Sequence, residues 1–279
     1  MGIEKFLLNR RVFSLGFAAA FLAPFAKAAA AEGAGNGSGF KGTLYPIGGA
    51  SFTTLRRFAE LAGGSSGKIL ILPHASSAPG ESADELANAF LGFGVKDTEV
   101  LMPNEKKSLP HCSAIFMSGG DQSRLVRLLD KAFVQQMRDF LRDGNLIGGT
   151  SAGAAAVPSR MIADGMSDGL PHSGSLVITD GLGLLPGYMV DTHVGARARQ
   201  DRLMVGLSLE SGLRGIGLDE DTAVEIKDGK ATVHGHGLAH VYRRSSEFKS
   251  KYADAPEGTM ASVQNMIYSI YPAGETFLL

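Results

Sequence analysis

The sequence predicts an α/β fold, in which a mostly parallel, twisted sheet is flanked by helices and antiparallel strands are added near the C-terminus. From residue 42 onward, short apolar and β-branched runs alternate with longer stretches whose apolar residues recur at spacings of three and four. This alternation is typical of strands joined by helices that have one buried face. After Gly215 the rhythm changes, and Asp228-Gly229 is a two-residue turn signal between two strand-like runs. An antiparallel hairpin is therefore expected there.

Each expected element follows from its own run of residues. The apolar runs predict strands over residues 43–47, 68–73, 98–102, 113–117, 146–148 and 188–191. The amphipathic stretches predict helices over residues 52–61, 82–91, 123–140 and 196–209. The C-terminal part predicts strands over residues 222–227, 230–234, 237–243 and 263–271.

The first 28 residues have the three zones of an export signal. A positive start with the pair Arg10-Arg11 precedes the apolar residues 12–25, and Ala26-Lys27-Ala28 offers a small-x-small cleavage site. The arginine pair resembles a twin-arginine signal. The alternative is an uncleaved membrane anchor, but the apolar stretch is shorter than the ~20 residues that a spanning helix needs. The protein is therefore expected to be exported to the periplasm or the extracellular space, without stable membrane insertion after cleavage.

The rest of the chain is expected to form one domain after a short leader. Residues 29–41 are small and glycine-rich, as in a flexible segment, and residues 42–279 form the folded body. A content of 44% apolar residues is enough for one extensive core, and Cys112 is the only cysteine, so no intramolecular disulfide can form. The formal net charge of −1 becomes −4 once the signal segment is removed. Nothing in this balance indicates nucleic acid as a partner.

The residues 146–154 combine an apolar strand with a tight glycine turn. They contain Gly149-Thr150-Ser151-Ala152-Gly153, which has the Gly-x-Ser-x-Gly pattern of a nucleophile elbow. A chain with 37 glycines can also contain this pattern in an ordinary turn. A second glycine turn, at residues 118–122, follows another apolar run and is expected at the same edge of the sheet. The N–H groups of Gly120 and Ala152 could then form an oxyanion hole.

A serine nucleophile needs a base and a group that orients the base. His193 stands apart from the other six histidines because it directly follows an apolar strand, whereas the others lie in loop or hairpin contexts that favour solvated or structural roles. For the acid, residues 219–221 offer three consecutive carboxylates and Asp191 is a fourth candidate. Composition cannot choose among them, and an exposed acidic turn explains the triple equally well. The other histidines are His74, His111, His172, His234, His236 and His240.

Six ordered segments between Gly42 and Leu279 resemble the cyanophycinases, within a wider family of serine peptidases that includes aspartyl dipeptidase. The expected fold is then flavodoxin-like, of the class I glutamine amidotransferase kind. An amidotransferase activity is not expected, because it needs a cysteine at the elbow and Cys112 precedes a strand instead. The segments are residues 47–49, 116–122, 149–154, 181–184, 191–193 with Arg197, Arg199 and Arg202, and 217–222.

The resemblance implies a role for each matching residue. It makes Ser151 the nucleophile, His193 the base and Glu220 the third member of the triad, and it requires no cofactor or metal. Gly120 and Ala152 take the positions of the oxyanion donors. The residues that match the substrate cleft of the family are Gln122, Asp191, Arg197, Arg199 and Arg202.

The implied substrate is cyanophycin, a polyaspartate whose side chains are amide-linked to arginine, from whose end the family releases β-aspartyl-arginine dipeptides. On a helix, Arg199 and Arg202 would share a face and could bind carboxylates, while Asp191 could meet a guanidinium. The alternative is that these arginines form ion pairs with Asp201, Glu210 or a neighbouring subunit. The sequence leaves a homodimer open.

Two positions depart from the family pattern. Thr192 stands where family members have glutamine, and Ser51 stands where they have an acidic residue. These departures keep a second hypothesis open, a serine dipeptidase that acts on other aspartyl peptides. A third hypothesis, a binding protein that has lost catalysis, is disfavoured because the set Ser151, His193 and Glu220 is intact.

Overall fold

The computed structural model describes residues 40–106, 108–165, 171–252 and 255–279. The expected signal segment and most of the expected leader therefore lie outside the described residues. Within these ranges, no helix is both long and apolar enough to cross a membrane.

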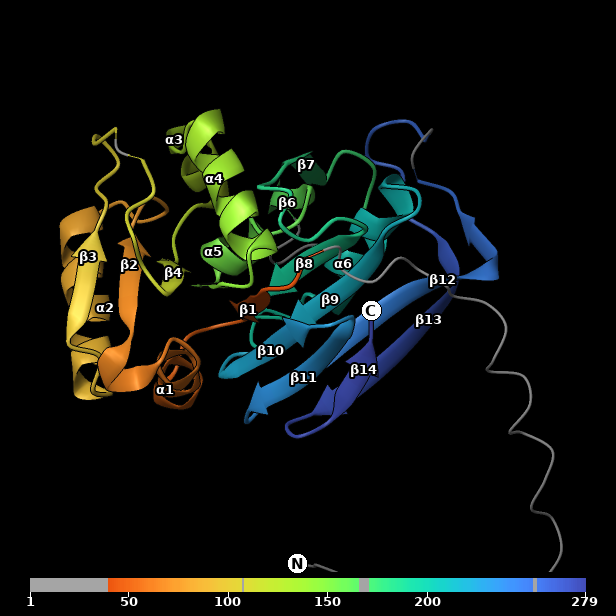
Figure 1. Cartoon of the computed structure of the whole chain (residues 1–279). Helices are drawn as coiled ribbons and strands as arrows, with labels where there is room; N and C mark the ends of the chain where they lie inside the picture. The colour runs from red at the N-terminus through yellow and green to blue at the C-terminus, as the bar shows by residue number, and fades with distance from the viewer. Residues whose placement is uncertain (1–39, 107, 166–170, 253–254) are drawn as a thin grey trace, which may run out of the picture. The chain divides into compact units, whose positions relative to one another are not determined.

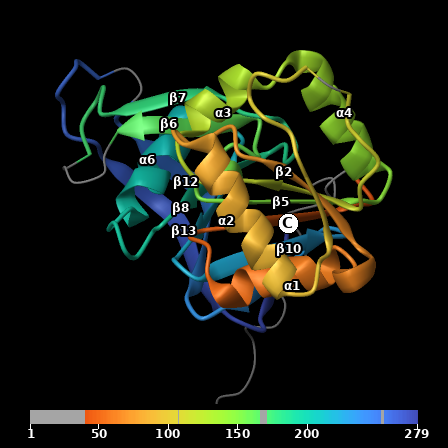
Figure 2. The same cartoon turned by 90° about the vertical axis from the view of Figure 1, so that its left-hand side faces the viewer.

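The larger sheet has a parallel centre and an antiparallel edge (Figures 1 and 2). Strands β1, β5, β4, β2 and β3 lie side by side in this order and run parallel. On the other side of β1, strands β10, β11 and β14 continue the sheet with antiparallel pairing. The predicted α/β class and its antiparallel addition are thus confirmed. The strands are β1 (Thr43–Ile47), β2 (Lys68–Leu72), β3 (Asp97–Val100), β4 (Ala114–Met117), β5 (Leu146–Thr150), β10 (Thr222–Lys227), β11 (Lys230–Gly235) and β14 (Thr276–Leu278).

Successive residues of the central strands point to opposite faces of the sheet, and helices cover both faces. Phe116 of β4 packs with Phe58 of α1 (Phe52–Leu61) and Phe90 of α2 (Pro79–Gly92), in a buried aromatic cluster. The neighbouring Ile115 belongs to the core on the other face, which includes Met137 of α4. The helices of that face are α3 (Gln122–Leu128), α4 (Lys131–Arg142) and α5 (Ala152–Ala155).

A second sheet contains the predicted cleft residue Asp191. Its order is β13-β12-β9-β8, with β8 parallel to β9 and the other pairs antiparallel. Helix α6 (Gln200–Leu209) packs on it through Leu203 and Leu207. A separate hairpin lies nearby, formed by β6 and β7. The strands are β6 (Arg160–Gly165), β7 (Leu176–Asp180), β8 (Tyr188–Thr192), β9 (Arg214–Leu218), β12 (Leu238–Ser250) and β13 (Val263–Pro272).

Some expected elements differ from the observed ones. The helix predicted over residues 123–140 is two helices, because Leu129 is extended and the Asp130 side chain accepts the N–H of Phe133 at 2.7 Å as the N-cap of α4. The helix predicted over residues 196–209 begins only at Gln200, after a turn in which Ala198 has φ 49°. The predicted strand 188–191 exists, but it belongs to the second sheet. Strands β6, β7, β9 and β14 were not predicted.

Candidate active site

Ser151 lies at the sharp turn between β5 and α5. Its backbone has φ 51° and ψ −111°, a conformation that residues other than glycine rarely adopt. Its N–H donates to Ile47 O at 2.9 Å. The flanking glycines make this turn sterically possible. A Cβ on Gly149 would lie 2.7 Å from the carbonyl carbon of Gly153, and a Cβ on Gly153 would lie 2.6 Å from Met117 O. The Gly-x-Ser-x-Gly pattern is therefore a requirement of close backbone packing at this turn.

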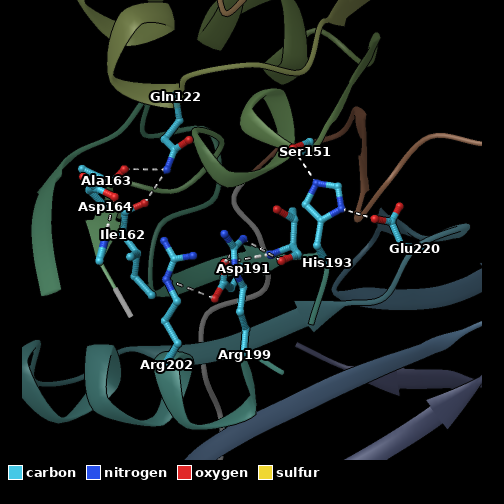
Figure 3. Close-up of polar contacts among 12 residues, drawn as sticks. Gln122, Ser151, Ile162, Ala163, Asp164, Asp191, His193, Arg199, Arg202 and Glu220 are labelled. Carbon is cyan, nitrogen blue, oxygen red and sulfur yellow. Dashed lines mark hydrogen bonds and ion pairs between the residues drawn. The ribbon is translucent and has the colours of Figure 1, made fainter. Parts of the chain in front are cut away.

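Ser151, His193 and Glu220 form one chain of hydrogen bonds (Figure 3). Ser151 Oγ lies 2.7 Å from His193 Nε2, and His193 Nδ1 lies 2.5 Å from Glu220 Oε1. Because a carboxylate only accepts, Nδ1 of the neutral histidine carries the proton and Nε2 accepts from the serine hydroxyl. This is the arrangement in which a histidine can take the proton of a serine nucleophile.

The three residues come from both sheets. Ser151 follows β5 of the larger sheet, His193 follows β8 of the second sheet, and Glu220 lies in the connection from β9 to β10. A parallel bridge pairs Glu220 with Gly49. A Cβ on Gly49 would lie 1.7 Å from Glu220 Oε2 and 3.2 Å from His193 Cε1. Gly49 therefore leaves the space that the carboxylate occupies, a role that no pattern around residue 49 predicted.

Burial is the main influence on the protonation of His193. It lowers the pKa of the imidazole below its ordinary value of 6.5, while the hydrogen bond and the charge of Glu220 oppose this shift. The positive charges of Arg197 and Arg199 lower the pKa further. Histidine is therefore held in the neutral form, which can act as a base.

Two backbone N–H groups, those of Gly120 and Ala152, are the oxyanion donors expected from the sequence. Ala152 is the first residue of α5, so its N–H has no partner within the helix. Gly120 has φ 134°, and a Cβ there would lie 2.1 Å from Ala75 O. A Cβ on the adjacent Gly119 would lie 3.5 Å from Ser151 Cβ, so this turn borders Ser151. In the described parts of the chain, neither N–H donates a hydrogen bond.

Asp191, Arg199 and Arg202 form a buried charged cluster next to the triad (Figure 3). Asp191 lies 3.7 Å from Arg199 Nη1 and 3.7 Å from Arg202 Nε. Burial raises the pKa of Asp191, and the two guanidinium groups oppose this shift. Burial also lowers the pKa of Arg199, to about 10. Both arginines thus face a carboxylate of their own chain, which is neither Asp201 nor Glu210.

The cluster keeps unused hydrogen-bonding capacity. Nη1 of Arg199 donates to Thr192 O at 3.0 Å, and Asp191 Oδ1 accepts the Thr192 N–H at 2.9 Å. Nε of Arg199, Nε and Nη1 of Arg202, and Oδ2 of Asp191 are buried without a hydrogen bond within the described ranges. Arg199 precedes α6, so the expectation that it shares a helix face with Arg202 is wrong. Asp191 brings the two arginines together instead.

The other predicted cleft residues lie in different environments. Gln122 Nε2 donates to the carbonyls of Ile162 and Ala163, at 2.8 Å each, and so supports β6 where its pairing with β7 is irregular. Arg197 is exposed in the turn after His193. Thr192 is buried at the end of β8.

The consecutive carboxylates 219–221 each contact a different histidine. Asp219 lies 3.0 Å from His240 Nε2, Glu220 contacts His193, and Asp221 contacts Nδ1 of His236. This geometry explains why composition could not single out one acid, and it makes Glu220 the one that reaches the serine-bound histidine.

Ser51, His74 and Cys112 lie outside the hydrogen-bonded chain of Ser151, His193 and Glu220. Asp221 accepts a hydrogen bond from Ser51, the N-cap of α1. His74 is buried, which lowers its pKa to about 4, and Cys112 is a buried free thiol. Across the described residues, no three or more His, Cys, Asp or Glu side chains are grouped to hold a metal ion.

Comparison with known proteins assigns the family. The model of peptidase family S51 matches residues 45–234. A cyanophycinase from Synechococcus elongatus is 33% identical over 259 residues, which cover 87% of this chain and 80% of the relative. A cyanophycinase from Geminocystis herdmanii is 39% identical over 199 residues, which cover 67% and 73%.

A solved structure shares the fold. The crystal structure of a peptidase from an acI-B1 Actinobacterium has a TM-score of 0.60 at 19% identity and covers 87% of this chain and 99% of its own. The resemblance to this peptidase family predicted from the sequence is therefore confirmed. The chain belongs to peptidase family S51 and is a serine-type peptidase.

Proposed function

We propose that the protein is an exopeptidase that hydrolyses cyanophycin to β-aspartyl-arginine dipeptides through an acyl-enzyme at Ser151. The hydrogen-bonded chain of Ser151, His193 and Glu220 carries this proposal. The identity of 33–39% with curated cyanophycinases supports the choice of polymer. The two buried arginines beside the triad support a substrate that carries carboxylates.

In the first step, Ser151 Oγ attacks an aspartyl carbonyl carbon of the polymer while its proton moves to His193 Nε2. The carbonyl oxygen becomes negatively charged, and the N–H groups of Gly120 and Ala152 stabilise it. Glu220 stabilises the imidazolium that forms. His193 then gives the proton to the amide nitrogen, the C–N bond breaks, and an ester of Ser151 remains.

In the second step, water hydrolyses the ester. His193 takes a proton from water as the hydroxide oxygen attacks the ester carbonyl, and the same two N–H groups stabilise the new oxyanion. The bond to Ser151 Oγ then breaks, and His193 returns the proton to that oxygen. The carboxylate product leaves with one oxygen atom from water.

The arginine cluster supports a role in binding the acidic part of the substrate. Two guanidinium groups against one carboxylate leave a formal charge of +1 in a buried place. A substrate carboxylate would neutralise this charge and accept from the unused N–H groups of Arg199 and Arg202. Gln122 and the exposed Arg197 complete the proposed cleft. The role of Asp191 is to hold the arginines, because its carboxylate already faces both of them.

A related activity on other aspartyl peptides is the second candidate function. Thr192 favours it, because this buried residue beside His193 replaces the longer glutamine of the family pattern. A different residue at the edge of the triad changes the shape that is offered to the substrate.

Substrate and nucleophile can be tested together. The purified protein, incubated with insoluble cyanophycin and separately with α-aspartyl dipeptides, should release β-aspartyl-arginine from the polymer, as identified by mass. Ser151→Ala should fold normally and lose about three or more orders of magnitude in turnover, because the attacking oxygen is missing. Cleavage of the dipeptides alone would favour the second candidate, and an active Ser151→Ala variant would contradict the acyl-enzyme.

The pH dependence should report the neutral form of His193. Because burial lowers the pKa of this histidine, the acid limb of kcat/KM is expected below pH 6.5. Glu220→Gln removes the group that raises this pKa, so the limb should move to still lower pH while kcat falls by about two to four orders of magnitude. A limb that moves to higher pH in the variant would refute this arrangement.

The role of Asp191 can be separated from substrate recognition. Asp191→Asn should reduce turnover of β-aspartyl-arginine and β-aspartyl-alanine units by similar factors, because the residue contacts Arg199 and Arg202. Replacing Arg202 with a neutral residue should raise KM strongly and should change the melting temperature little. A loss confined to arginine-bearing units would instead place Asp191 against the substrate guanidinium.

We also propose that residues 1–28 direct export and are removed. The protein recovered from the exported fraction of its host should begin after Ala28, as read by N-terminal sequencing. A protein that keeps residues 1–28 and stays in the cytoplasm would contradict this proposal.

A further inference from the structure

The Asp219 carboxylate joins the turn after β8 to strand β12. Oδ1 accepts the N–H of Gly195 at 2.8 Å and lies 3.0 Å from His240 Nε2, and Oδ2 accepts the N–H of Leu238 at 3.1 Å. Gly195 belongs to the turn after β8, whereas Leu238 and His240 belong to β12. A single acidic side chain thus ties the turn after β8 to the second sheet.

The protonation of this network follows from its donors and acceptors. Since a carboxylate only accepts, His240 Nε2 carries the proton toward Asp219. In the neutral tautomer Nδ1 is then an acceptor, and it receives the hydroxyl proton of Tyr268 at 2.7 Å. His240 is buried and stacks against the Tyr268 ring at 5.9 Å. The network therefore extends from β13 to the turn that carries His193.

Glycines allow the carboxylate to come this close. A Cβ on Gly195 would lie 3.0 Å from Asp219 Oδ1, and a Cβ on Gly237 would lie 2.8 Å from Asp219 Cβ. A Cβ at Gly195 would require the carboxylate to move by a few tenths of an ångström. Glycines at 195 and 237 thus leave the space that the Asp219 side chain occupies.

The tied turn begins with the catalytic base. His193 has φ 56°, which is strained for a residue with a side chain, and Gly195 follows it by two residues. Glu220 follows Asp219 directly in the sequence. Asp219 therefore lies where it can fix the backbone on both sides of the His193–Glu220 hydrogen bond.

We propose that Asp219 is a positioning residue that holds His193 in line with Ser151 and Glu220, an inference that rests on the triad proposed above. The group has to be a carboxylate, because three donors converge on its two oxygens. An amide of the same shape would present one NH₂ group to an N–H donor. With the amide oxygen toward Gly195 and His240, the NH₂ group would face the N–H of Leu238, and with the amide turned over it would face Gly195 and His240. In either orientation donors face each other, which moves the side chain that holds the turn.

The test compares Asp219→Asn with Glu225→Gln in the full-length mature protein. Glu225 is the matched control because it also contacts a histidine, with Oε2 3.0 Å from His234 Nε2, and its side chain is 19% exposed, as is that of Asp219. Each variant is treated with a small fluorophosphonate, which phosphonylates Ser151 with loss of fluoride, and the maximal rate constant and the half-saturating concentration are measured. Hydrogen–deuterium exchange over residues 193–199 is followed in parallel.

For Asp219→Asn we expect a maximal labelling rate constant about 10²-fold lower, because a small misplacement of a catalytic group has effects of this size. The half-saturating concentration should hardly change, and exchange over residues 193–199 should rise. Gly195→Ala should reproduce both effects, because the added methyl group pushes the carboxylate away. This variant replaces Asp219→Asn in the test if Asp219→Asn does not fold. Glu225→Gln should match the unmodified protein in both measurements.

The outcomes separate this inference from the triad. A lower melting temperature of the Asp219→Asn variant with an unchanged labelling rate constant would show a structural role only and overturn the proposal. Unchanged exchange over residues 193–199 would overturn it as well. If the unmodified protein is not labelled at Ser151 while Asp219→Asn still raises the exchange, the triad fails and the tether of the turn stands.

Discussion

The hydrogen bond between Ser151 Oγ and His193 Nε2 connects two sheets that are otherwise separate in their backbone pairing. The serine is fixed by the elbow after β5, where close backbone packing at Gly149 and Gly153 restricts movement. The histidine is fixed by the end of β8 and by a turn that starts in a left-handed conformation. A shift of one sheet against the other would lengthen this bond directly. The packing between the sheets is therefore under the same constraint as the chemistry.

The connection between β9 and β10 meets this constraint because it passes from the second sheet to the larger one. Its three carboxylates divide the work: Asp219 binds the second sheet, Glu220 reaches His193, and Asp221 contacts Ser51 at the start of α1. Acids in a row normally repel one another, but here each accepts a hydrogen bond from a different histidine. Glu220 also keeps 51% of its side chain exposed, so its charge stays hydrated and needs little compensation from the protein.

Local signals made much of this architecture predictable. The strand and the glycines around Ser151 define the elbow within a few residues, and His193 directly follows a strand. The boundaries of β1 and α1 follow from their own residues for the same reason. The fate of β8 could not be predicted, because pairing with β9 or with the larger sheet depends on distant segments. The same holds for Asp191, whose sequence neighbourhood does not reveal that Arg199 and Arg202 lie beside it.

The error in the predicted start of α6 has its physical origin outside the helix. Periodicity extended a helix back to residue 196, but the turn there has backbone bonds of its own, such as that from Arg199 N–H to Val194 O, and its Gly195 N–H donates to Asp219. Helical propensity over four residues is worth at most a few kcal/mol, so a hydrogen bond to a charged group such as Asp219 is of a size to oppose it. The turn over residues 193–199, which precedes α6, carries His193, Arg197 and Arg199. Its irregular backbone lets one short turn present a base to the serine and guanidinium groups to the proposed substrate cleft.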